Sequence, residues 1–344
     1  DWGYIKFKDS STDATFDGNG DYLSGSILEH CTVEYGGGIG SGQILVDTSS
    51  PFINNCTIRY SSSDGINTIP SGVAKITNTT LNNSANNGIR CDIPSGSECY
   101  LYGNPISSHD YNGIQTGGGG NATISNNNIS ENGQNSGMFS GRGIAHENGG
   151  TTIISDNTIT DNTGGGTYCF SAGASFTISG NTISNNGPAG QFAAGGITLY
   201  ASNVPLVVIT DNVIHSNSSS DDWGGVRVDI HQPGSLTFEG NIISNNTAVY
   251  NIGGAEFSID TYDDNTSSSI SNNIFSQNSA GSFGALKLNL VRSNNWQSSK
   301  PISVNTFTGN TIAYNTTTGA EPQSIHLEGD GLFGDNNIIG NNGQ

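Results

Sequence analysis

The sequence has few charged residues and very few basic ones, which excludes several classes of protein. Charged residues make up 11% of the 344 residues, only ten are Lys or Arg, and the net charge is −19. DNA, RNA and acidic lipid surfaces are polyanions, so this chain would be repelled by them at long range. We therefore expect no nucleic-acid partner, and the sequence contains no apolar segment long enough to insert into a membrane.

The chain also lacks the composition of a helical repeat protein and the cysteine spacing of a zinc protein. Helical repeats are rich in Ala, Leu, Glu and Lys, whereas this chain has 49 Gly and long runs of Asn, Ser and Thr. None of its five cysteines is spaced as CxxC. The fold must therefore be one that tolerates many glycines and short polar side chains.

One phrase recurs along the chain: Asn, any residue, an apolar residue, two residues, and Asn again. Cys31, Cys56 and Thr79 take the place of the first Asn in the earliest copies, and weaker copies begin at Asn104 and Asn127. Successive copies begin 23 to 37 residues apart, which is the period of a solenoid. The clear copies begin at Asn157, Asn181, Asn212, Asn241, Asn273, Asn310 and Asn337.

The residues between these copies predict strands rather than helices. Apolar residues alternate with polar ones, as in Val226, Val228 and Ile230, and this period of two is a strand signal. Asn tolerates the left-handed conformation of a tight turn and bonds its own backbone. Stacked in every coil, such residues would bond one another, which predicts an all-β, right-handed parallel β-helix of roughly twelve rungs with an asparagine ladder.

The repeated phrase and the Gly-Gly-Ile strand that follows it resemble the parallel β-helix repeats of the pectate-lyase-like superfamily. The resemblance covers nearly the whole chain. It implies the fold, but this scaffold carries lyases, hydrolases, adhesins and structural proteins, so it implies no single activity. It also implies calcium as a possible cofactor, for which Asp260, Asp263 and Asp264 offer hard oxygen ligands.

The unbroken repeat predicts a single domain over residues 1–344. We expect entry rungs over 1–60, regular rungs over 61–330 and a last partial rung over 331–344. Neither end shows a capping helix, and exposed solenoid ends are unpaired strand edges. We therefore expect end-to-end contacts or flanking segments there, and we interpret the acidity as that of a secreted protein, extracellular or at the cell surface.

The coils lengthen after about residue 127, and the added residues flank one strand in each coil. Loops that flank one strand of a rigid stack form the walls of a groove whose floor is that strand. We expect this groove over rungs six to ten, with aromatic rings for sugar stacking. Its expected substrate-binding residues are Trp223, His231, Tyr250, Tyr262 and Trp296.

Alternation along the same strand predicts which polar side chains point outward into the groove. Arg227, Glu256 and Lys287 should form one column, with Tyr200 and Asp229 beside them. In a lyase, Lys287 would remove the proton next to a uronate carboxyl, and Arg227 would neutralise that carboxyl. Glu256 opposes this role because it stabilises the charged lysine. A hydrolase would instead use two carboxylates, such as Asp229 with Glu256 or Glu256 with Asp260.

Three hypotheses follow. The favoured one is a secreted polysaccharide lyase that acts on a uronate-containing glycan by β-elimination. The second is a non-catalytic surface protein, namely an adhesin, a glycan-binding rod or a self-assembling structural element, in which Arg227, Glu256 and Lys287 form an ordinary ion-pair ladder. The third is a glycoside hydrolase with a carboxylate pair. The partner in the enzymatic hypotheses is a polysaccharide or surface glycan.

The sequence also permits predictions about the cysteines and one histidine. Cys91 and Cys99 bracket a loop short enough to close with a disulfide, and Cys31 and Cys56 hold equivalent positions one coil apart. Adjacent strands lie about 4.8 Å apart, so this second pair could form a disulfide or remain as two stacked thiols. His109 is expected at an exposed turn.

Overall fold

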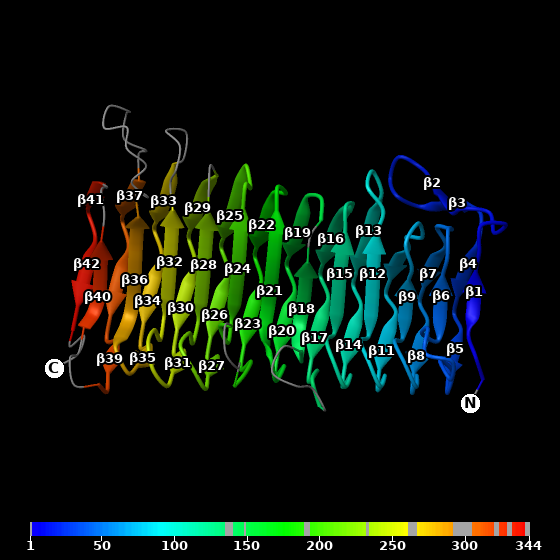
Figure 1. Ribbon diagram of the computed structural model, residues 1–344, viewed down its shortest axis with the longest axis horizontal. Helices are drawn as coiled ribbons and strands as arrows, with labels where there is room; N and C mark the ends of the chain where they lie inside the picture. The colour runs from blue at the N-terminus through cyan, green and yellow to red at the C-terminus, as the bar shows by residue number, and fades with distance from the viewer. Residues whose placement is uncertain are drawn as a thin grey trace. The chain divides into compact units, whose positions relative to one another are not determined.

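The computed structural model describes most of the chain and divides it into two compact units, residues 1–162 and 163–344. We describe each unit by itself. The described residues are 2–134, 140–147, 149–188, 193–231, 234–260, 267–291, 305–319, 323–328 and 332–340. Both units consist of strands and turns (Figure 1).

Unit 1 is a stack of six coils, and each coil contributes one strand to each of three parallel sheets. The first sheet contains β1 (Ile5–Phe7), β6 (Ile44–Val46), β9 (Ile66–Thr68), β12 (Ile89–Ile93), β15 (Ile114–Gly118) and β18 (Arg142–Glu147). The second contains β4 (Ile27–Glu29), β7 (Phe52–Asn54), β10 (Lys75–Thr77), β13 (Glu98–Tyr102), β16 (Asn121–Ser125) and β19 (Thr152–Ser155). The third contains β5 (Thr32–Glu34), β8 (Thr57–Arg59), β11 (Thr80–Asn82), β14 (Pro105–Ser107), β17 (Asn128–Ser130) and β20 (Thr158–Thr160).

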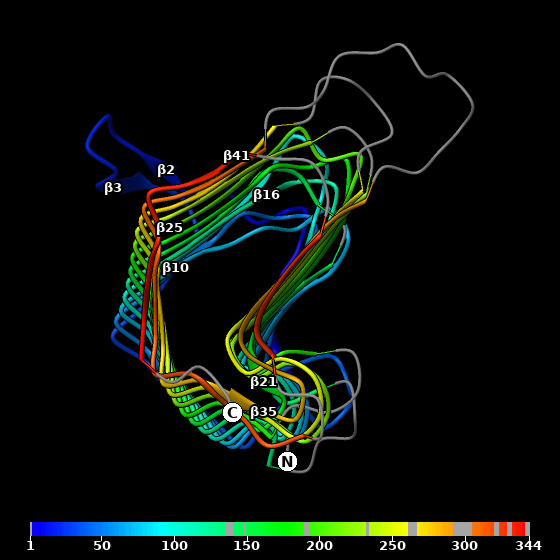
Figure 2. The same cartoon turned by 90° about the vertical axis from the view of Figure 1, so that its left-hand side faces the viewer.

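A short hairpin, β2 (Thr15–Phe16) and β3 (Tyr22–Ser24), leaves the first coil of unit 1. It stands out from the stack beside the second sheet (Figure 2). Its Phe16 ring contacts Phe52, and Lys75 lies 3.9 Å from the centre of the Phe16 ring. The Lys75 amine also donates a 2.8 Å hydrogen bond to the Gly20 carbonyl, which ties the hairpin to the sheet.

Unit 2 repeats the architecture in six further coils. The first sheet contains β21 (Gly165–Ala172), β24 (Ile197–Ser202), β28 (Val226–His231), β32 (Ala255–Asp260), β36 (Phe283–Val291) and β40 (Gln323–Glu328). The second contains β22 (Phe176–Ser179), β25 (Leu206–Thr210), β29 (Ser235–Glu239), β33 (Ser268–Ser271), β37 (Asn305–Thr308) and β41 (Leu332–Gly334). The third contains β23 (Thr182–Ser184), β26 (Val213–His215), β30 (Ile242–Ser244), β34 (Ile274–Ser276), β38 (Thr311–Ala313) and β42 (Asn337–Ile339).

A small fourth sheet is found in unit 2, at the turns between the third and first sheets. It contains β27 (Ser218–Ser219), β31 (Thr247–Ala248), β35 (Ser279–Ala280) and β39 (Thr316–Thr317). All four sheets are parallel, as a chain that coils in one direction requires. The expected all-β parallel β-helix and its twelve or so rungs are confirmed, six rungs in each unit.

Inward side chains of successive coils stack to form a narrow apolar core in each unit. In the first sheet of unit 1, Ile44 pairs with Ile66, Ile66 with Ile89, and Ile89 with Ile114. All four are fully buried. Each buried isoleucine contributes roughly 1.5–3 kcal/mol relative to exposure, so the column stabilises the unit even though apolar residues are a minority of the chain.

The asparagine ladder is confirmed where the second sheet turns into the third. Asn212 receives two bonds at its Oδ1, of 3.0 Å from the Asn181 backbone N–H and of 2.9 Å from Asn181 Nδ2. Asn212 repeats the pattern toward Asn241, and its Nδ2 also donates to the Ile178 carbonyl. The residue before each ladder position adopts a positive φ, as at Asp211 with φ of 57°, so every turn closes identically.

Three details of the sequence analysis change in the structure. The last copy begins at Asn336 rather than Asn337, because Asn336 Oδ1 accepts the bond from Asn310 Nδ2. His109 is fully buried rather than exposed, since it stands in a second ladder after the third sheet, where its Nδ1 accepts from the Ser84 N–H and its own N–H donates to Asn132 Oδ1. The five cysteines, all within the described residues, are free thiols, and no disulfide joins Cys91 to Cys99. Among the described residues there is no helix long and apolar enough to cross a membrane.

Candidate functional site

The first sheet of unit 2 aligns the polar residues that the sequence analysis singled out. Arg227 on β28 pairs with Glu256 on β32, and Glu256 pairs with Lys287 on β36. Asp229 pairs with Tyr200 on β24 in the neighbouring column. The predicted columns are therefore correct residue by residue. We call Arg227, Asp229, Glu256 and Lys287, with the rings of Tyr200 and Trp223, the polar array.

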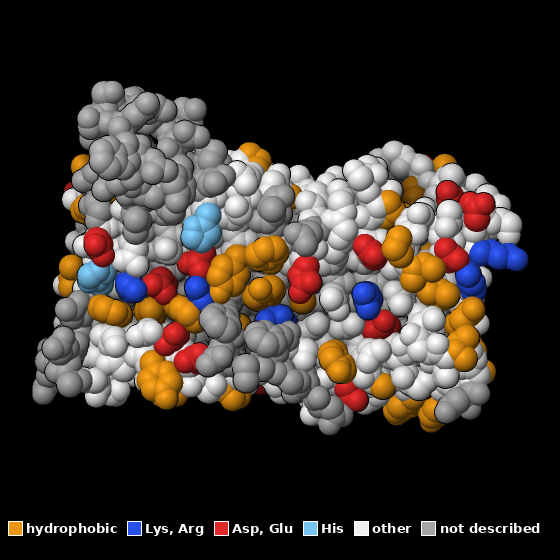
Figure 3. All heavy atoms as spheres, viewed as in Figure 1, with side chains coloured by type: hydrophobic (Ala, Val, Ile, Leu, Met, Phe, Trp, Pro, Cys, Tyr) orange, Lys and Arg blue, Asp and Glu red, His pale blue; other side chains and the backbone are white. Residues whose placement is uncertain are grey.

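Figure 3 shows acidic and basic side chains gathered among apolar ones over β24, β28, β32 and β36. Lys287 Nζ lies 3.0 Å from Glu256 Oε1. The other carboxylate oxygen of Glu256, Oε2, accepts a hydrogen bond from Trp223 Nε1. The Glu256 side chain is 10% exposed, so its negative charge is held by one cation and one neutral donor in a poorly solvated position.

Arg227 is held between aromatic rings and a carboxylate. Its guanidinium carbon lies 3.7 Å from the centre of the Trp223 ring and 4.7 Å from the centre of the Tyr200 ring. Its Nε and Nη2 both donate to Asp229 Oδ2, at 2.9 and 2.8 Å. Its Nη1 is buried and has no hydrogen-bond partner among the described residues. Arg227 is therefore fixed by two rings and one carboxylate oxygen, and one of its buried nitrogens is left without a hydrogen-bond partner in the described part of the chain.

Two aspartates, Asp229 in the array and Asp222 near it, occupy environments that favour a protonated carboxyl. Burial raises the pKa of Asp229, and the nearby charge of Glu256 raises it further, while Arg227 lowers it. Asp222, in the turn before β28, also has a raised pKa, through burial and through repulsion by Asp221 and Glu256. The net direction at Asp229 is upward, so loss of solvent outweighs the arginine there.

An apolar row supports the array, and the sequence analysis missed it. Four residues of successive coils bridge one to the next: Ala194, Trp223 and Ile252, which precede strands of the first sheet, and Phe283, which begins β36. Ala194, Trp223 and Ile252 are buried against one another, with Phe283 packed on them. Lys287 Nζ lies 5.8 Å from the centre of the Phe283 ring. The sequence contains a signal for this row, because each of the four apolar residues directly precedes a glycine.

The expected substrate-binding residues are distributed unevenly. Trp223 is only 9% exposed, so its ring supports Arg227 and Glu256 instead of lying open on a loop as expected. Tyr250 is 58% exposed in the turn after β31, and His231 is exposed at the end of β28. Tyr262 and Trp296 lie outside the described residues.

The structure does not test the calcium ligands expected from the family resemblance. Asp260 ends β32, where its backbone pairs with His231 and Val291. Asp263 and Asp264 lie outside the described residues. Within the described ranges, no group of three or more His, Cys, Asp or Glu side chains could hold a metal ion. A calcium site therefore stays a prediction.

A comparison of the sequence with models of protein families identifies the family of this chain. The model of a right-handed beta helix region matches residues 42–204 and residues 141–285, which together span 42–285. No curated protein matches the chain. Because the matched span exceeds half of the chain and the described strands form parallel coils, this protein belongs to the right-handed β-helix family.

Proposed function

We propose that the protein is an enzyme that acts on a polysaccharide at the polar array of unit 2. The family supports a general placement in the pectate-lyase-like superfamily. The observation that carries the proposal is a pair of buried carboxylates, Asp229 and Glu256, on adjacent strands and in different environments. Such pairs divide the roles of acid and base in the hydrolysis of glycosidic bonds.

Hydrolysis is the chemistry that these contacts support best. Adjacent strands and an offset of two residues separate the two Cα atoms by about 8 Å, compatible with the carboxyl spacing of roughly 5–9.5 Å in glycosidases. Asp229, with its raised pKa, would give a proton to the leaving oxygen. Glu256, held by Lys287 and Trp223, would serve as the charged partner that activates water or attacks the sugar.

β-Elimination is the second candidate, and one observation favours it. Arg227 and Lys287 lie in one column with Glu256 between them, so two cations are available to neutralise a uronate carboxyl. Lys287, at 28% exposure, is the most exposed of the four charged side chains in the array. However, Lys287 Nζ is in a 3.0 Å ion pair with Glu256, and a lysine must lose its proton to act as the base of an elimination. Hydrolysis needs no such deprotonation, so we rank it first.

A panel of neutral and uronate-containing polysaccharides tests the proposal with two readouts. New reducing ends without ultraviolet absorbance indicate hydrolysis, and new absorbance from an unsaturated uronate indicates elimination. In either case Asp229→Asn should lower the rate by about 100-fold or more. The control is Asp335→Asn, an exposed carboxylate of unit 2 outside the array. Binding without any product would support the non-catalytic alternative and overturn the enzymatic proposal.

A further inference from the structure

A polar hollow lies in unit 1, at the corner where β8, β11, β14 and β17 end. Its volume is about 570 Å³, within the range of roughly 300–1,000 Å³ that small-molecule sites occupy. It is formed within unit 1 by residues between 60 and 134, so it is separate from the polar array. The proposed function does not use it.

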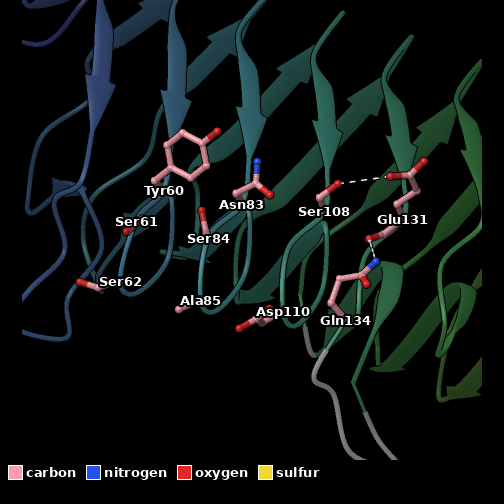
Figure 4. Close-up of a pocket in the computed structure, with 10 residues that line it drawn as sticks. All are labelled: Tyr60, Ser61, Ser62, Asn83, Ser84, Ala85, Ser108, Asp110, Glu131 and Gln134. Carbon is pink, nitrogen blue, oxygen red and sulfur yellow. Dashed lines mark hydrogen bonds between the residues drawn. The ribbon is translucent and has the colours of Figure 1, made fainter.

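Two rows of side chains line this hollow, one residue from each coil in each row (Figure 4). The upper row is Tyr60, Asn83, Ser108 and Glu131. All four have a positive φ, between 55° and 60°, because each is the single turn residue that follows a strand of the third sheet. The identical turn in each coil therefore repeats a side-chain position along the hollow at the strand spacing of about 4.8 Å.

The lower row and the bonds between the rows add polar groups. Ser62, Ala85, Asp110 and Gln134 form this row in Figure 4. Gln134 Nε2 donates to the Glu131 carbonyl at 2.9 Å, and Ser108 Oγ donates a 3.3 Å bond to Glu131 Oε2. Carboxylate, amide and hydroxyl groups therefore lie together over four coils. This is the chemistry that pairs with the hydroxyls of a sugar chain.

A tyrosine platform ends the upper row. Tyr60 is 42% exposed, and its ring is seen face-on in Figure 4. Tyr35, the equivalent residue one coil earlier, lies with its ring nearly parallel at a centroid distance of 5.2 Å and is 54% exposed. Arg59 lies 5.4 Å from the Tyr60 ring centre and is paired with Glu34 at 2.8 Å. Exposed rings held in this way offer an apolar face at low entropic cost.

The charges of the hollow select the ligand class. Of the residues that line it, Asp110 and Glu131 are acidic and none is Lys or Arg. An anionic chain of uronate, sulfate or phosphate groups would be repelled, whereas a neutral sugar needs only hydrogen bonds and an aromatic face. We propose that this hollow binds a neutral, linear glycan that runs from coil to coil, with one sugar ring on Tyr60 and hydroxyls bonded by Asn83, Asp110 and Glu131.

The test measures retardation of the full chain in native gels that contain neutral polysaccharides, with a polyuronate gel for comparison. Wild type should be retarded by at least one neutral polymer, and Tyr60→Ala should weaken that binding by about tenfold or more, as one lost stacking contact would. Tyr102→Ala is the matched control, because Tyr102 is 40% exposed on the second sheet of unit 1. It should bind as wild type does.

A further variant separates this site from the polar array. Asp110→Asn should also weaken binding of the neutral polysaccharide. Glu256→Gln should leave unchanged the difference in retardation that Tyr60→Ala causes. Equal retardation of Tyr60→Ala and wild type would overturn the proposal. Retardation only by the polyuronate, or only by a cationic glycan, would overturn it as well, since the ligand would then be charged.

Discussion

The Arg227 guanidinium carbon lies 3.7 Å from the centre of the Trp223 ring, while the Trp223 N–H donates a hydrogen bond to Glu256. One buried indole thus supports both a cation and a carboxylate of the polar array. Arginine stacks its planar guanidinium on aromatic faces and binds a carboxylate through a planar fork, whereas lysine offers a compact ammonium that lacks both geometries. The array therefore depends on the shape of Arg227 as well as on its charge.

Arg227→Lys is accordingly expected to lower polysaccharide turnover although it keeps the positive charge. The lost stacking and the lost second bond to Asp229 should reduce the rate by about tenfold to thirtyfold. Arg90→Lys, at an exposed position of the first sheet of unit 1, should turn over substrate as wild type does. Initial rates on the substrate that the panel identifies measure both. An unchanged rate in Arg227→Lys would show that only the charge matters.

The ladder in unit 1 offers a matched pair of adjacent asparagines for a stability test. Asn127 is 2% exposed and accepts bonds from the Asn104 N–H and Nδ2, both at 3.0 Å, whereas Asn128 is exposed. Asn127→Ala leaves buried donors without acceptors, so the free energy of unfolding should fall by about 2–4 kcal/mol. Asn128→Ala should change it by less than about 0.5 kcal/mol. Urea unfolding compares the two variants, and equal losses would mean that the ladder adds no stability.

Acid should destabilise unit 1 through His109. Burial lowers its pKa from 6.5 to about 3, although its bond to the Leu81 carbonyl partly opposes this. Between those pH values His109 is protonated in the unfolded chain but not in the folded chain. The free energy of unfolding therefore falls as the pH falls from about 6.5 toward 3. Burial likewise lowers the pKa of His146 to about 4, which adds a loss in the same direction.

His109→Asn separates the two histidines, because asparagine is the residue found at most ladder positions. The amide oxygen can accept from the Ser84 N–H, and the amide N–H can donate to the Leu81 carbonyl. We expect this variant to lose less stability than wild type between pH 6.5 and 4, in chemical denaturation at several pH values. His30→Asn, at an exposed turn, should keep the wild-type slope. If both variants match wild type, His109 is not the acid-sensitive group.

The thiols should react in two classes. Cys31 is partly exposed, and the other four cysteines are buried. Burial raises the pKa of Cys169 to about 12, and a hydrogen bond that the Cys99 thiol donates to Cys91, together with burial, raises the pKa of Cys99. Since the thiolate is the reactive form, a thiol reagent should label about one site in the folded protein and five after unfolding. Mass spectrometry counts the labels, and fast labelling of Cys99 in the native state would contradict the buried thiol contact.

The fold was accessible from the sequence because each coil repeats the same local constraints. A turn residue with a positive φ, a ladder asparagine and an alternating strand recur together, so the columns that contain Arg227, Glu256 and Lys287 could be predicted by alignment alone. The last coil was misplaced by one residue because Asn336 and Asn337 are both asparagines, and only the hydrogen bond from Asn310 distinguishes them.

The candidate site was less predictable because burial and pairing depend on contacts between coils. An exposed aromatic and a buried one look alike in a sequence, so Trp223 was expected on an open loop. His109 was misplaced for a related reason, since its neighbours in the sequence resemble a polar turn. The ladder position is visible only when Asn132, one coil later, is aligned with it.

The measurement that tests the central claim most directly is the release of reducing ends from the best polysaccharide substrate by wild type and by Glu256→Gln. Glutamine keeps the shape of the side chain but cannot act as the charged partner of Asp229. The account predicts that the rate falls by about 100-fold or more, with the fold retained, while Glu239→Gln on the second sheet of unit 2 stays at the wild-type rate. Equal rates in wild type and Glu256→Gln would contradict a catalytic role for the polar array.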